Sequence, residues 1–255
     1  GGRLTLVNTF FHDNEFSILT GKLPKADIEI RDSRFWNQKR PTRHSHGIYI
    51  GEVRSFKLIG SHFMGTDRGH QVKSRALDNI IAYNRIEDAP NGNSSRLIDL
   101  SNCGFSIVLG NQLHQAATSE NFNAIGYGPE GCKKRNERQM RLYVINNTFV
   151  NEARESDFVR NFAGGDVLVS NNLIFGSVRI LSGTGTVENN VRLSSAKVPK
   201  DRWSAVSDPL IVDRAKDLSA LESGALVPNR VFDSPSGTRA RSGHARLDIG
   251  AEEFV

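Results

Sequence analysis

The sequence has few cysteines and no long apolar stretch, and these absences exclude several protein classes. Two cysteines among 255 residues cannot form a disulfide-dense scaffold or a zinc site of four thiolates. No apolar run approaches the ~18 residues that a membrane span needs, so the sequence predicts no membrane span. No signal peptide is visible at its start. Motifs of P-loop nucleotide-binding proteins, zinc proteases and serine hydrolases are also missing, so those functions have no support.

The overall composition is that of a folded, slightly basic protein. Hydrophobic residues make up 38% of the chain and charged residues 24%, which is too apolar for a disordered protein. The 33 Lys and Arg residues exceed the 28 Asp and Glu residues by 33 − 28 = 5, and this excess favours an anionic partner. Nucleic acid is not the expected partner, because the basic residues do not form a dense stripe interleaved with aromatic residues.

Asparagine marks an internal repeat. The chain contains 21 asparagines, and 20 of them precede residue 191. They recur in a short sequence motif. In this motif, a run in which every second residue is apolar is followed by Asn or Ser, then any residue, then Phe, Ile or Leu. The anchors of the motif are Asn8, Ser33, Ser61, Asn84, Asn111, Asn147, Asn172 and Asn190. Self-similarity at roughly 20–30 residues is typical of solenoid proteins.

The residues inside each repeat favour strands over helices. Apolar residues alternate with a period of two, as in Leu142 and Val144, and Gly, Asn and Asp interrupt the short runs. Stacked Asn side chains can form hydrogen-bonded ladders between identical turns. We therefore predict an all-β fold, a right-handed parallel β-helix over residues 1–190. A β-sandwich with Asn-rich turns is the alternative, although a sandwich does not need the same residue at the same turn.

The repeat stops after Asn190, and residues 191–255 have a different character. They contain four of the eight prolines and a possible short helix at residues 215–222. Irregular structure fits this composition better than further coils. Because the open end of a solenoid exposes unpaired backbone and apolar core, we expect this segment to act as a C-terminal cap.

A second strand precedes several anchors, and aligning four such strands predicts which side chains share a face. The aligned segments are HGIYIG (46–51), HQVKSR (70–75), RLIDLS (96–101) and NAIGYG (123–128). Ile48, Val72, Ile98 and Ile125 form a core column, so the alternate positions point outward. The outward face and its edge then gather seven polar side chains over three turns: His46, Tyr49, His70, Lys73, Arg75, Arg96 and Asp99.

This group of side chains is the candidate functional site. The alternative is an ordinary solvated face with an incidental salt bridge from Lys73 or Arg75 to Asp99, which would contribute little. Two long basic loops, at residues 36–45 and 116–140, would lie on either side and wall a groove. Loops of this length on a regular scaffold are usually functional or disordered.

One turn of the repeat resembles a known family. The segment HQVKSRALDNIIAYNRI (residues 70–86) is similar to the lysine-bearing coil of the chondroitinase-B and alginate-lyase family of polysaccharide lyases. The resemblance implies an acidic polysaccharide as the partner and Lys73 as the catalytic base. The family's arginine one turn onward has no counterpart near Ser101 to Cys103, so Arg75 or Arg96 would replace it. The closing DIGAEEF resembles bacterial secreted or surface β-helix proteins, which implies a secreted, periplasmic or cell-surface location.

The implied reaction is β-elimination from a uronic acid. Arg75, or a bound Ca²⁺ ion, would neutralise the sugar carboxylate, and Lys73 would take the C5 proton. His70, Tyr49 or His46 would protonate the leaving oxygen. His46, Arg96 and Asp99 are also candidate substrate-binding residues, and Asp99 could instead orient Lys73 or bind Ca²⁺.

Three other functions remain open. They are a non-catalytic glycan-binding or adhesive β-helix, a C5-epimerase, and a glycoside hydrolase, which needs two carboxylates about 5–9.5 Å apart. Asp99 has no evident acidic partner in the sequence for the last of these. Cys103 and Cys132 follow adjacent coils, where either a disulfide or two free thiols would fit.

Overall fold

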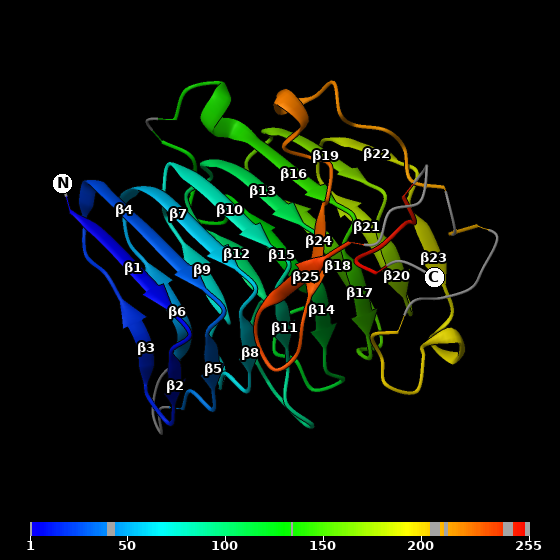
Figure 1. The fold of residues 1–255 in the computed structure, drawn as a ribbon, viewed down its shortest axis with the longest axis horizontal. Coiled ribbons are helices and arrows are strands. Elements are labelled where there is room, and N and C mark those ends of the chain that lie inside the picture. Colours follow the sequence, from blue (N-terminus) through cyan, green and yellow to red (C-terminus); the bar gives the residue numbers. More distant parts are fainter. Residues whose placement is uncertain are drawn as a thin grey trace.

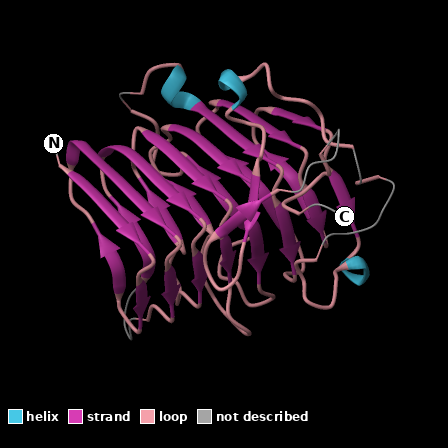
Figure 2. Cartoon of the chain, viewed as in Figure 1, coloured by secondary structure: helices cyan, strands magenta, loops and turns pink. Residues whose placement is uncertain are grey.

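The chain winds into a parallel β-helix of about seven turns, as the repeat predicts. The computed structural model describes residues 2–39, 44–133, 135–204, 210–211, 214–241 and 247–252. Figure 1 shows the turns stacked from β1 at one end to β22 and β23 at the other, and Figure 2 shows that strands make up nearly all of the regular structure. The β-sandwich alternative is therefore excluded.

From β1 to β21, each turn contributes one strand to each of three parallel sheets, and β22 and β23 extend two of them. Sheet A contains β1 (Arg3–Val7), β4 (Leu23–Arg31), β7 (Val53–Ile59), β10 (Asp78–Ala82), β13 (Phe105–Leu109), β16 (Arg141–Ile145), β19 (Asp166–Ser170) and β22 (Thr186–Glu188). Sheet B contains β2 (Phe10–His12), β5 (Arg34–Trp36), β8 (His62–Met64), β11 (Arg85–Glu87), β14 (Gln112–Gln115), β17 (Thr148–Asn151), β20 (Leu173–Phe175) and β23 (Val191–Leu193). Sheet C contains β3 (Phe16–Leu19), β6 (His46–Ile50), β9 (Val72–Ser74), β12 (Ile98–Leu100), β15 (Asn123–Tyr127), β18 (Ser156–Asn161) and β21 (Val178–Ser182).

A buried ladder of polar side chains fixes the corner between sheets A and B. The side chains of Asn84 and Asn111 donate to Asn111 and Asn147 respectively, both at 2.9 Å. The ladder continues through Asn172 to Asn190, at 3.0 and 2.8 Å. A buried amide is stable only when its hydrogen bonds are made, and stacking identical turns supplies a partner at every step. The ladder expected from the sequence is therefore confirmed.

The first anchor of the repeat is one residue later than the sequence pattern suggests. Thr9, not Asn8, bonds to Ser33 of the next turn, with 3.0 Å between the two hydroxyl oxygens. Asn8 instead has a left-handed backbone (φ 52°), as do Asn146 and Asn171 immediately before their ladder residues. Asn tolerates this conformation better than most residues, which explains why Asn is abundant at two neighbouring positions of the turn.

The segment after β23 lies along the side of the coils. It contains the short antiparallel pair β24 (Arg230–Phe232) and β25 (Thr238–Ala240), which crosses the stacked strands in Figure 1. Its hydrogen bonds reach far back along the solenoid, since the backbone N–H of Gly237 donates to Gly60 at 2.7 Å. The expected helix at residues 215–222 is not formed; a single 3₁₀ turn, η3 (Glu222–Gly224), follows instead.

Short 3₁₀ turns are the other helical elements of the described residues, namely η1 (Arg138–Met140) and η2 (Ser195–Lys197). None of the helices within the described part of the chain has the length and apolar character to cross a membrane.

Candidate functional site

Sheet C brings together the side chains that the aligned strands predict. Tyr49 of β6 pairs in register with Lys73 of β9, and Lys73 pairs with Asp99 of β12. Neighbouring strands lie about 4.8 Å apart, so these outward side chains can touch. The core column of Ile48, Val72, Ile98 and Ile125 is also aligned as predicted, and all four side chains are fully buried.

Asp99 is the centre of the group, and its side chain is only 1% exposed. One carboxylate oxygen accepts a hydrogen bond from Arg96 at 2.9 Å. The other lies 3.4 Å from the Lys73 ammonium and also accepts the Ser101 hydroxyl. Burial by itself raises the pKa of Asp99, but His70, Lys73, Ser101 and Arg96 outweigh it, so the pKa lies below its ordinary value. Asp99 is therefore a buried carboxylate that positions cations, and it does not face solvent as a substrate ligand would.

Arg75 lies one residue beyond β9 and is the most exposed of the site's three cations, at 24%. Its Nε donates to the Tyr49 hydroxyl and its Nη1 to the Asn102 side chain, both at 2.8 Å. The guanidinium carbon also lies 5.4 Å from the centre of the Tyr49 ring. These contacts hold the guanidinium in one orientation, as recognition of a planar carboxylate requires.

Glu130 also belongs to the site, although aligning the four strands of the chain with one another did not predict it. Its carboxylate accepts a hydrogen bond from Lys73 at 2.7 Å and pairs with Arg75 at 2.5 Å, while its side chain stays 38% exposed. Glu130 follows β15 in the loop after residue 128, outside any repeating strand. The only signal in the sequence is its position two residues beyond the last aligned segment.

The loop that carries Glu130 is held in place by a disulfide and an arginine. Cys103 and Cys132 are bonded to each other, which resolves the alternative left open by the sequence. Arg135 donates to the backbone carbonyl of Asn102 at 2.9 Å and to that of Arg75 at 3.1 Å. The loop at 116–140 thus packs beside the site, as expected. Residues 40–43 of the other expected wall lie outside the described residues.

Two stacked imidazoles form the edge of the site. The rings of His46 and His70 are 5.1 Å apart and nearly parallel, and His46 Nδ1 accepts the backbone N–H of His70. Burial, reinforced by the nearby Lys73 charge, lowers the pKa of His46 to about 4. Burial also lowers the pKa of His70 to about 3, although Asp99 opposes the shift. Both rings are therefore neutral at pH 7, and His70 Nε2 lies 3.7 Å from Asp99.

The residues present do not fit a Ca²⁺ ion. Calcium needs six to eight oxygen ligands, several of them carboxylates. The two carboxylates of the site, Asp99 and Glu130, are instead neutralised by lysine and arginine. Among the residues that the structure describes, no three His, Cys, Asp or Glu side chains are grouped as a metal ion would require.

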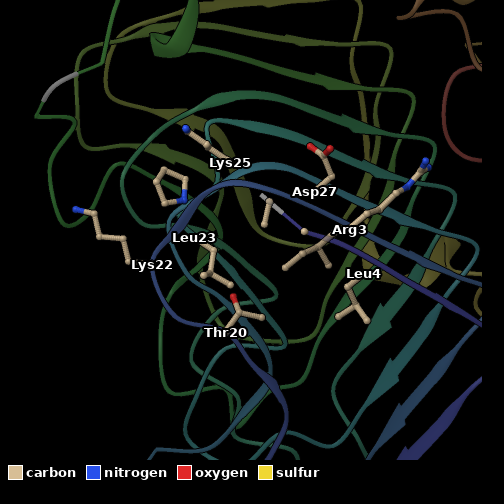
Figure 3. A pocket seen from close by; sticks show the side chains of 11 residues that line it. Arg3, Leu4, Thr20, Lys22, Leu23, Lys25 and Asp27 are labelled. Carbon is tan, nitrogen blue, oxygen red and sulfur yellow. The ribbon is translucent and has the colours of Figure 1, made fainter.

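The end of the solenoid carries a separate hollow of about 560 Å³. Figure 3 shows Arg3, Leu4, Thr20, Leu23 and Asp27 around it. It lies beside β1 and β4, the first two strands of sheet A, and is lined by none of the residues predicted to form the site.

Comparison with known proteins gave no match: no family model, curated protein or solved structure matches the chain. The parallel β-helix is therefore shown by the structure alone. The resemblance to polysaccharide lyases rests on the residues of one turn.

Proposed function

We propose that this protein binds an acidic polysaccharide across the outer face of sheet C. The observation that carries the proposal is the contact of Glu130, whose carboxylate is bound by Lys73 and Arg75 together. A pair of cations that holds the protein's own carboxylate has the geometry to hold the carboxylate of a uronic acid. Arg75 would be the principal ligand, because its orientation is already fixed by Tyr49 and Asn102.

Aromatic rings on the same face support a sugar ligand. Tyr49 is half-buried beside both Lys73 and Arg75. Four turns further on, Phe162 is 41% exposed and lies close to Arg96, with 5.4 Å between its ring centre and the guanidinium carbon. Glycan sites combine such apolar rings with a few oriented polar groups.

The test is binding of a polyuronate without sulfate groups, such as polygalacturonate oligosaccharides, measured by titration calorimetry at low salt. Arg75→Gln should weaken binding about tenfold, since one charge-assisted hydrogen-bonded contact is lost. Arg54→Gln is the matched control, because Arg54 is an exposed arginine of β7 in sheet A. Equal affinity of the Arg75→Gln and Arg54→Gln proteins would contradict the proposal.

β-Elimination is the second candidate function, and the juxtaposition of Lys73, Arg75 and Tyr49 favours it. When the sugar carboxylate takes the place of Glu130, Arg75 would neutralise it and Lys73 would remove the C5 proton. The C4–O bond then breaks, and Tyr49 would protonate the departing oxygen, because buried His70 is neutral at pH 7. Asp99 and Glu130 oppose this chemistry in the free protein, because both carboxylates form ion pairs with the Lys73 ammonium group.

Product analysis distinguishes the catalytic functions from binding alone. A lyase yields an unsaturated sugar that absorbs ultraviolet light, and Lys73→Ala should abolish that absorbance. New reducing ends without absorbance would indicate a hydrolase instead. A hydrolase has little structural support, because Asp99 is too deeply buried to reach a glycosidic oxygen.

A further inference from the structure

Sheet C continues past the site into a second basic region. Asp99 pairs in register with Gly126 of β15, and Gly126 pairs with Arg160 of β18. Arg160 therefore lies in the same outward column as Lys73, three strands further on, or about 14 Å at the spacing of neighbouring strands.

The space between the two regions is bridged by Arg96 and Phe162. Gly126 has no side chain, and a Cβ there would lie 2.9 Å from the Arg96 side chain. The missing side chain lets Arg96 cross this position toward Phe162. Arg160 lies near the same ring, with 4.8 Å between its guanidinium carbon and the ring centre. A continuous basic and aromatic path thus leads along the sheet from Lys73 to Arg160.

Beyond Arg160 the surface is hollowed, with a volume of about 620 Å³. Four arginines line this arginine hollow together with two acidic residues, which leaves an excess of two positive charges (4 − 2). The residues are Arg154, Arg160, Arg179 and Arg192, with Glu155 and Asp157. Phe122 lies at the hollow and is 63% exposed.

The arginines of the hollow differ in whether other groups of the protein already bind their guanidinium groups. Arg179 donates to Asp157 at 2.7 Å, and Arg192 donates to the carbonyl of Val178 at 2.9 Å. Arg154 and Arg160 make no ion pair within the described part of the chain, and both are exposed. Their planar guanidinium groups are available to bind an oxyanion through two parallel hydrogen bonds.

We propose that the arginine hollow is a second subsite, which binds a carboxylate or sulfate group of a sugar further along the same polysaccharide chain. This inference rests on the proposed function of the Lys73 and Arg75 site. Phe122 would contact the apolar face of that sugar, while Arg154 and Arg160 would bind its charged group. Long oligosaccharides would then bind more tightly than short ones, because only long chains reach both regions.

The experiment compares two double variants that remove the same charge. Arg154→Ala/Arg160→Ala changes the hollow, and Lys25→Ala/Lys57→Ala removes two exposed cations from sheet A. Calorimetry at fixed salt would use a short and a long polygalacturonate oligosaccharide, dextran sulfate and single-stranded DNA. The hollow variant should bind the long oligosaccharide about tenfold more weakly and the short one unchanged, whereas the control should bind both nearly as the wild type does.

The outcomes separate the two proposals. If the hollow variant behaves like the control toward every ligand while Arg75→Gln still weakens binding, the second subsite is wrong and the first stands. If Arg75→Gln has no effect on the short oligosaccharide, the proposed function itself fails. A larger loss with dextran sulfate than with polygalacturonate assigns the hollow to sulfate, and the reverse assigns it to carboxylate. Tighter binding of DNA than of either polysaccharide, lost in the hollow variant, would overturn the glycan assignment.

Discussion

The outer faces of sheets B and C differ in whether the rest of the chain covers them. Both faces carry charged side chains at outward positions of successive turns. On sheet B, His62 and Glu87 are bonded at 2.7 Å and each is 8% exposed, with Arg202 of the C-terminal segment beside them. On sheet C, by contrast, Arg75 and Glu130 remain open to solvent.

The C-terminal segment accounts for this difference. Its apolar residues pack on sheets A and B, as Trp203 and Ile249 do against Phe175 of β20. Arg85 of β11 is enclosed between Trp203 and Phe232, with 5.4 and 4.7 Å from its guanidinium carbon to the two ring centres. The repeat thus creates polar faces on several sides, and the non-repeating segment determines which of them remains available for a ligand.

Removing a buried carboxylate from each face should give the largest effects on the free energy of unfolding. Asp99→Ala should lower the free energy of unfolding by about 3–5 kcal/mol, because it leaves buried Arg96 without its ion-pair partner and Lys73 with Glu130 alone. Glu87→Ala should cost less, since Arg202 is 33% exposed and can turn toward solvent. Urea unfolding measures both, with Asp99→Asn as the variant that keeps the side chain's size. Equal losses of unfolding free energy in the two variants would contradict the inference that Asp99 is more important for stability than Glu87, which the C-terminal segment covers.

The histidines of sheet C predict an intermediate effect that depends on pH. The pKa values of His46 and His70 fall from an ordinary 6.5 to about 4 and about 3 on folding. The unfolded chain therefore binds more protons below pH 6.5, so stability is complete above that pH and is lost as the pH falls toward 4 and 3. Replacing both histidines with glutamine should flatten the dependence of the free energy of unfolding on pH in this interval.

Tyr49→Phe is the control for that measurement, because it alters the ring beside His46 and keeps both imidazoles. Its stability should decline with acid as steeply as that of the wild type. An unchanged slope in the double histidine variant would show that other groups govern the acid sensitivity of this face.

The register of sheet C could be predicted from the sequence because it follows from repetition. Once Val72 and Ile98 are aligned as core, alternation places Lys73 and Asp99 side by side on the outer face. The same alignment, extended by one turn, would have placed Arg160 in that column. The aligned segments end at residue 128, one turn before SDFVRN (residues 156–161), although the anchor Asn147 precedes that segment.

The parts that could not be predicted are those that do not repeat. Glu130 reaches Lys73 from 57 residues away, through a loop whose path no periodicity defines. The C-terminal segment likewise meets sheet B through contacts such as Gln112 with Glu252, at 2.6 Å, that only tertiary packing determines. Thr9 shows a smaller limit of prediction from the sequence. Asn8 and Thr9 are adjacent polar residues, and the sequence pattern does not determine which of them bonds to the next turn.

Neutralising Glu130 should have the smallest effect on stability and a clear effect on binding. Glu130→Gln removes a partly exposed ion pair, so the free energy of unfolding should change by less than about 1 kcal/mol. In the free protein this carboxylate occupies the cations that a uronic acid would need, and a ligand has to displace it. The variant should therefore bind polygalacturonate more tightly, by about tenfold. Glu188→Gln, which makes the same charge change at the Lys216 ion pair, should bind as the wild type does. Weaker binding by Glu130→Gln would mean that Glu130 contacts the sugar instead of competing with it, and sheet C would then recognise a hydroxyl-rich ligand.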